Sequence, residues 1–233
     1  MEDGKMTVIE HLEELRRRII ISILSVVFCS IGGYFVAARV MHILAAPIGQ
    51  NKLVYLTPSE GFVTHIQVSL VCGIIMASPI VLYQIWAFIN PALKPEERRY
   101  FFTFMPLVIF LFCCGVAGGT FFILPAGMKF LINFSTVDLQ PMLSVSNYFS
   151  FALSVIVSCG VVFELPLVAL LLGKIGLINS GKLSLYRKYA ILCAFIIAAV
   201  ITPSVDMFTQ LLVAIPIVFL YEGSIILLKM YRL

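Results

Sequence analysis

Four long stretches of this chain contain no Asp, Glu, Lys or Arg. They cover residues 19–38, 61–93, 100–128 and 139–163 and are 20, 33, 29 and 25 residues long. A helix needs roughly 20 apolar residues to cross the hydrocarbon core of a bilayer. Each stretch can therefore span a membrane. Because only 12% of the 233 residues are charged, against about a quarter in an ordinary soluble domain, we conclude that the chain is a membrane protein.

Two shorter uncharged stretches follow, at 189–205 and 207–221, with Asp206 between them. The apolar character on every face favours helices over barrel strands, which would alternate polar and apolar residues. We predict an all-α fold in one domain over residues 1–233, with spans near 19–38, 66–89, 101–124, 148–173, 189–204 and 207–228. These last two uncharged stretches are short, so that two short helices are expected there, which predicts local thinning of the bilayer. Prolines inside the spans predict kinks at Pro79, Pro106, Pro166 and Pro216.

The positive charges predict the orientation of these spans. With the N-terminus in the cytoplasm, thirteen of the sixteen Lys and Arg residues lie on the cytoplasmic side, and only Arg39, Lys52 and Lys129 lie outside. Lys and Arg near spans are retained in the cytoplasm. This bias predicts an even number of spans and two cytoplasmic termini. The first apolar stretch is too long for a cleavable signal peptide, so we expect the first helix to remain.

Several classes of function find no support in the sequence. It contains no CxxC or CxxH spacing, no P-loop, no GxSxG and no HExxH, and its three histidines lie far apart. We therefore predict no metal site, no cofactor, no catalytic residue and no nucleic-acid partner. All six cysteines fall inside predicted spans, where a thiol behaves as a small apolar group: Cys29, Cys72, Cys113, Cys114, Cys159 and Cys193.

Acidic residues cluster in two cytoplasmic segments. HLEELRRR (11–18) reads as a helix lying at the membrane surface, with Glu10 and Glu14 on one face and Glu14 spaced to pair with Arg18. A self-neutralised, solvated helix is the alternative interpretation. The loop NPALKPEERRY (90–100) holds Glu96 and Glu97, which the orientation signal does not require.

One acid lies within a predicted span. Glu164 precedes Lys174 by ten residues, which places it about 15 Å from the inner boundary of the bilayer. A charge at this depth is costly, so an intramembrane acid indicates function, although it can also tie helices together. We expect it to face a groove. The segment ITPSVDMFTQ (201–210) forms a polar hinge in which Asp206 and Gln210 lie one turn apart.

Several motifs, in order along nearly the whole chain, resemble the TatC family, the polytopic receptor subunit of the twin-arginine protein translocase. They are HLEELRRR (11–18), LTPSEGF (56–62), SPIVLYQIWAFINPALKPEERR (78–99), FELP (163–166), TPSVDMFTQ (202–210) and AIPIVFLYE (214–222). The resemblance implies a concave, glove-like arrangement of six spans in the bacterial cytoplasmic membrane. It also implies a receptor that binds twin-arginine signal peptides and recruits TatA- and TatB-type subunits, forming oligomers that export folded proteins by the proton-motive force.

The resemblance also implies roles for individual residues. Glu14 and Glu97 match the acids that receive the arginine pair, and the secondary candidates near them are Glu10, Glu96 and Arg16. Residues matching polar contacts to partner helices are Glu164, Asp206 and Gln210. Positions that match structural motifs are Pro47, Phe88 and Pro91. The alternative is an ion-coupled secondary carrier that uses Glu164 and Asp206, but the chain lacks a Gly-interrupted repeat shared by its halves. An intramembrane enzyme would need a second catalytic group at the depth of Glu164.

Overall fold

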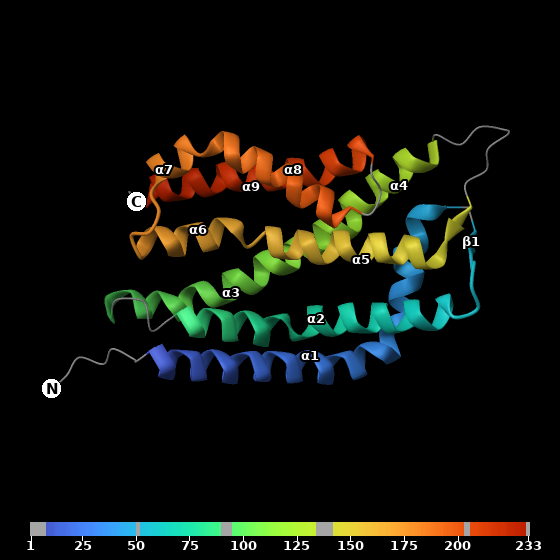
Figure 1. The fold of residues 1–233 in the computed structure, drawn as a ribbon, viewed down its shortest axis with the longest axis horizontal. Helices are drawn as coiled ribbons and strands as arrows, with labels where there is room; N and C mark the ends of the chain where they lie inside the picture. The colour runs from blue at the N-terminus through green and yellow to red at the C-terminus, as the bar shows by residue number, and fades with distance from the viewer. Residues whose placement is uncertain (1–7, 50–51, 90–94, 134–141, 203–205, 232–233) are drawn as a thin grey trace.

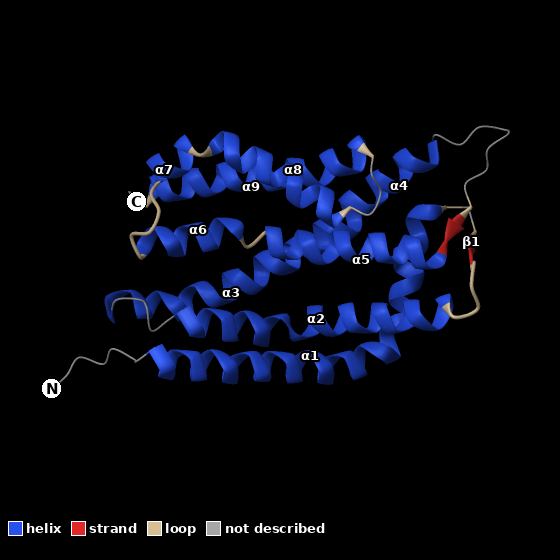
Figure 2. Ribbon diagram, in the orientation of Figure 1, coloured by secondary structure: helices blue, strands red, loops and turns tan. Residues whose placement is uncertain are grey.

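The structure is a computed structural model that describes residues 8–49, 52–89, 95–133, 142–202 and 206–231, without the side chains of residues 8 and 95–103. Its regular structure is almost entirely helical (Figures 1 and 2). The helices are α1 (Val8–Ala45), α2 (Glu60–Ile89), α3 (Pro95–Gly118), α4 (Leu124–Asn133), α5 (Val145–Val162), α6 (Leu165–Lys174), α7 (Ser180–Leu185), α8 (Arg187–Ile201) and α9 (Met207–Met230). A 3₁₀ turn, η1 (Ala46–Ile48), follows α1, and a π-helical segment, η3 (Gly119–Ile123), joins α3 to α4.

Five segments of the described chain are long and apolar enough to cross a membrane. They are Ile9–Ile48, Glu60–Ile89, Phe104–Asn133, Val145–Lys174 and Met207–Met230. The remaining pass is made by α8, whose 15 residues rise about 22 Å. Together they give the six passes predicted. The start of α1 and the end of α9 lie at the same end of the bundle, here called the terminal end (Figure 1).

The final helix extends beyond its uncharged stretch, in agreement with the predicted span 207–228. The uncharged stretch stops at Tyr221, whereas α9 continues to Met230 and has 24 residues. Glu222, within this helix, forms an ion pair with Arg187 of α8, with Nε and Oε1 2.8 Å apart. Only α8 is therefore short, and the predicted pair of short helices is corrected to one.

The N-terminal motif also differs from the prediction. HLEELRRR does not form a separate surface helix, because it belongs to α1, which runs unbroken for 38 residues. Residues 8–31 contain no Gly or Pro, so nothing in the backbone chemistry ends the helix at the membrane boundary. The motif therefore extends α1 beyond the bilayer by about two turns.

Prolines interrupt the helices to different extents. Pro79, Pro106 and Pro216 lie inside α2, α3 and α9, which stay helical. Pro166 instead falls in the first turn of α6, just after the fourth span divides into α5 and α6. Its missing N–H cannot donate to the carbonyl of Val162, and the chain makes a tight turn there, with Glu164 N bonded to Val161 O at 3.1 Å.

Close helix crossings hold the bundle together. A Cβ added to Gly73 of α2 would lie 2.7 Å from Ser30 Cα of α1. A Cβ added to Gly115 of α3 would lie 2.9 Å from the Cys159 carbonyl carbon of α5. Small residues allow such approach in membranes, where lipid supplies no hydrophobic drive for helix association. The fourth span is the most enclosed, with half of its most apolar window buried, against 6% in the first.

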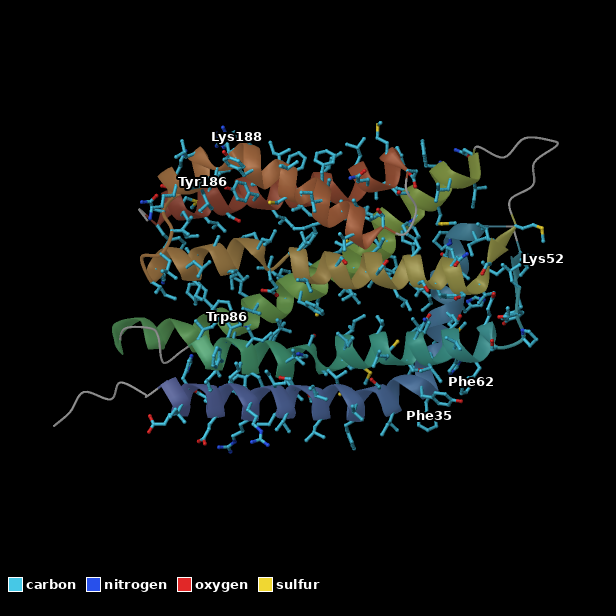
Figure 3. The ribbon with its side chains drawn as sticks, viewed as in Figure 1. Phe35, Lys52, Phe62, Trp86, Tyr186 and Lys188 are labelled. Atoms are coloured by element: carbon cyan, nitrogen blue, oxygen red, sulfur yellow. The ribbon has the colours of Figure 1, made fainter. Side chains whose placement is uncertain are left out.

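A small cap closes the end opposite the terminal end. β1 (Leu53–Val54) pairs in parallel with β2 (Leu143–Ser144), with Leu53 opposite Leu143. The hydroxyl of Tyr148 donates to the Leu44 carbonyl, and Ser144 Oγ donates to Glu60 Oε2 at 3.4 Å. Figure 3 shows Lys52 at this end and Tyr186 and Lys188 at the terminal end.

Candidate functional site

The terminal end of α1 holds Glu14 in a fixed orientation. Glu14 Oε1 accepts from Arg18 Nε at 3.0 Å and from Arg18 Nη2 at 2.5 Å. Arg18 Nη1 then donates to Gln84 Oε1 of α2 at 3.1 Å. The i,i+4 pair predicted from the sequence therefore forms, and it is anchored to a second helix.

A second contact links the same two helices nearby. The His11 ring stacks on the Phe88 ring of α2, with centroids 4.3 Å apart and planes 13° from parallel. His11 Nδ1 lies 3.7 Å from Glu14 Oε2. That oxygen is buried and has no hydrogen-bond partner within the described chain. One Glu14 oxygen is therefore hydrogen-bonded to Arg18, and the other has no hydrogen-bond partner in the described chain.

The two other residues predicted for this part of the site lie at the surface. Glu10 and Arg16 are exposed. A shallow hollow of about 520 Å³ is lined by Arg16 together with Glu13, Arg17, Ile20 and Ile21. Exposed charges at this end also contribute to the electrostatic potential of the surface.

The predicted cytoplasmic loop is partly helical. Glu96 and Glu97 lie in the first turn of α3, which begins at Pro95, although their side chains fall outside the description. Pro91 lies outside the described residues. The start of α3 and the end of α2 share the terminal end with the start of α1 (Figure 1). Helix N-termini favour negative charge, which suits both acids to this position.

Glu164 lies where the fourth span divides. Its backbone caps α6, and its side chain is only 7% exposed. Both carboxyl oxygens are buried, and neither finds a hydrogen-bond partner among the described residues. The sequence predicted that this acid faces a groove, whereas the structure packs it against protein. Glu164 lies between Gly160 and Pro166, which are also buried, so this part of the fourth span packs inside the bundle.

Asp206 and Gln210 serve separate contacts at the start of α9. Asp206 caps the helix by accepting from Thr209 N at 2.7 Å, and Thr209 Oγ1 also donates to Asp206 Oδ2 at 2.5 Å. Gln210 Nε2 donates to the Phe195 carbonyl of α8 at 3.0 Å. The two residues thus fix the start of α9 and join it to α8. Pro203 and Ser204, also in the hinge motif, lie outside the described residues.

Comparison with known proteins decides the family. A family model described as Sec-independent protein translocase protein (TatC) matches residues 10–216. This chain belongs to the TatC family. It is 41% identical to the TatC protein of Carboxydothermus hydrogenoformans, with 100% of this chain and 96% of the relative covered. It is 42% identical to TatC of Aquifex aeolicus, covering 97% and 95%, and 36% identical to chloroplastic TATC of Pisum sativum, covering 98% and 65%.

A solved structure extends the comparison to the fold. The crystal structure of the Twin Arginine Translocase Receptor TatC matches with a TM-score of 0.88 and 43% identity, covering 96% of this chain and all of that one. The match confirms the all-α fold class, and the six-helix, glove-like arrangement agrees with TatC. TatC proteins are components of a protein transport system, which agrees with the prediction that the chain is not an enzyme.

Two residues beside the Glu14–Arg18 pair were missed by sequence reasoning. His11 lies against Glu14, and Gln84 accepts a hydrogen bond from Arg18, at the terminal end. A helical signal existed, because Gln84 and Phe88 are four residues apart and share a face of α2. The sequence does not specify which face of α1 meets that face. The contacts across the two helices therefore required the structure.

Proposed function

We propose that this chain is the receptor and core assembly subunit of a twin-arginine translocase. It binds signal peptides bearing paired arginines and recruits TatA- and TatB-type subunits, so that folded proteins cross the membrane by the proton-motive force. The observation that carries this proposal is the match over 96% of the chain to the crystal structure of the TatC receptor.

The proposal places the protein in the bacterial cytoplasmic membrane with its terminal end in the cytoplasm. Residues 1–233 act as one membrane domain. Support comes from the thirteen Lys and Arg residues that the predicted topology assigns to this side. The start of α1, the end of α2 and the start of α3 then present their acids to arriving signal peptides.

Glu14 and Glu97 receive the two arginines in this proposal. A guanidinium presents a rigid planar fork of donors that a carboxylate accepts bidentately, whereas an ammonium cannot reproduce that geometry. Support comes from the orientation of Glu14, which Arg18 and Gln84 hold with one oxygen unused. Glu10 and Glu96 add negative potential, and Arg16 shapes the entrance to the site.

Partner subunits contact the intramembrane polar residues. Glu164 has two buried oxygens without partners, and an unsatisfied buried polar group costs about 1–3 kcal/mol. A partner helix that donates a hydrogen bond relieves this cost once the carboxyl group, which is buried within the chain in this structure, has turned outward. Asp206 and Gln210 keep α8 and α9 in position for the same partners. Pro47, in η1, Phe88 and Pro91 are the positions to which we assign structural roles.

Binding of a fluorescent twin-arginine peptide to the purified protein in detergent tests the docking site. Glu97→Ala removes a charged hydrogen bond, which is worth about 1.5–3 kcal/mol, so the Kd should rise roughly 10- to 150-fold. Glu13→Ala removes an exposed acid at the same end and should change the Kd much less. Equal affinities for the unaltered protein and the Glu97 variant would exclude Glu97 from the docking site.

The ion-coupled carrier is not favoured. Its second titrating group would be Asp206, which both the Thr209 amide and hydroxyl engage at the start of α9. The family to which the chain belongs is a protein translocase component.

A further inference from the structure

At the terminal end of α1, only one of the two Glu14 carboxylate oxygens is hydrogen-bonded within the described chain. Both donors from Arg18 go to Oε1, and Oε2 is buried with no hydrogen-bond partner in the described chain. Gln84 of α2 anchors Arg18, and Arg18 in turn holds Oε1, so that the other oxygen faces away from the guanidinium. Oε2 is thus an acceptor with a fixed direction and no donor.

His11 covers that acceptor. Its Nδ1 lies 3.7 Å from Oε2, beyond the 2.7–3.2 Å of an ordinary N–H···O hydrogen bond. The imidazole instead rests flat on the Phe88 ring. Its side chain is 42% exposed against 17% for Glu14, so His11 forms the outer layer. Moving it aside uncovers Oε2 and the face of Phe88 and leaves the Arg18 contacts in place.

The space that His11 fills has the chemistry of a guanidinium site. An arginine head group is planar, carries N–H donors at its edge, and stacks on aromatic faces while its edge donates to a carboxylate. The imidazole in this structure is also planar, lies parallel to an aromatic ring and turns a nitrogen toward a carboxylate. A lysine ammonium can approach the carboxylate, but it has no plane to stack.

We propose that His11 is an internal placeholder for an arginine of the signal peptide. On docking, the guanidinium displaces the imidazole, stacks on Phe88 and donates to Glu14 Oε2. His11 therefore competes with the peptide and tunes its affinity, and Phe88 with Glu14 sets the preference for arginine over lysine. The inference rests on the proposed function, because it concerns the same docking site.

Substitutions at His11 test this competition, with Arg–Arg and Lys–Lys peptides titrated against the full-length protein in detergent. His11→Ala uncovers the site, so the Kd for the Arg–Arg peptide should fall about three- to tenfold, while the Kd for the Lys–Lys peptide should fall much less because an ammonium cannot stack on Phe88. His11→Arg supplies a tethered guanidinium and should give the largest loss of Arg–Arg binding. His11→Lys is its matched control, with the same charge but no plane, and should lose less.

The controls separate this inference from folding and from the proposed function. Because His11 is partly exposed, all three variants should keep the thermal unfolding temperature of the unaltered protein. Weaker Arg–Arg binding by His11→Ala, or equal losses in the Arg and Lys variants, would overturn the placeholder role while leaving the receptor function intact. If the unaltered protein bound Arg–Arg and Lys–Lys peptides equally, the proposed function and this inference would both fail.

Discussion

At the scale of single residues, two acids of this protein lack hydrogen-bond partners for different local reasons. Glu14 keeps one oxygen unused because Arg18 occupies the other. Glu164 has neither oxygen bonded within the described chain because it sits in a helix break among apolar neighbours. In the proposed function, the first accepts a donor from the signal peptide, and the second accepts a donor from a partner helix inside the membrane.

Substitution of Glu164 distinguishes hydrogen bonding from charge. Glu164→Ala should reduce co-purification of a TatB-type subunit several-fold and leave binding of the twin-arginine peptide nearly unchanged. Glu164→Gln should be milder, because an amide still makes hydrogen bonds without a charge. Undiminished co-purification with the Ala variant would refute the partner contact. Equal losses of the TatB-type subunit in both variants would show that partner binding requires the ionised carboxylate.

Part of the arrangement around Glu14 and Glu164 could be predicted from the sequence. The Glu14–Arg18 pair follows from helical spacing alone, and the depth of Glu164 follows from counting residues to Lys174. The stacking of His11 on Phe88 did not follow, because it depends on how two antiparallel helices are aligned. The helix break at Glu164 was likewise visible only as a proline that predicted a kink.

At the scale of elements, charge counting located the spans but misjudged one helix end. The predicted last span, 207–228, agrees with α9 to within two residues. The motif HLEELRRR, in contrast, was separated from the helix to which it belongs. A sequence shows where charges lie, but charges that lie outside the bilayer do not end a helix.

The α1–α2 crossing offers a prediction at this scale. Gly73→Ala places a methyl group 2.7 Å from the Ser30 Cα atom, and overpacking of this kind costs about 1–3 kcal/mol. The thermal unfolding temperature in detergent should therefore fall, as should binding of the twin-arginine peptide, because His11, Gln84 and Phe88 depend on the same crossing.

Gly223→Ala is the matched control for that variant. The same methyl group on α9 meets no described atom within 4 Å, so stability should be unchanged. Equal unfolding temperatures for the two variants would show that the close approach of α1 and α2 does not stabilise the bundle.

At the scale of the whole molecule, the charge bias correctly required an even number of passes, and the two helix termini do share one end (Figure 1). The parallel pairing of β1 with β2 was not foreseen, because two residues in each strand leave no sequence period to detect. Thinning of the bilayer stays a prediction, now resting on α8 alone, since its rise of about 22 Å falls short of the roughly 30 Å hydrocarbon core.

Recognition of paired arginines by the terminal end is the proposal on which the other roles at this site depend. Site-specific photocross-linking of a twin-arginine signal peptide in membranes tests it, with probes placed across residues 10–18 and 94–99 and with Arg–Arg and Lys–Lys peptides compared. We expect strong labelling at both segments with the Arg–Arg peptide and its loss with the Lys–Lys peptide. Absence of labelling with both peptides, in a correctly inserted protein, would contradict it.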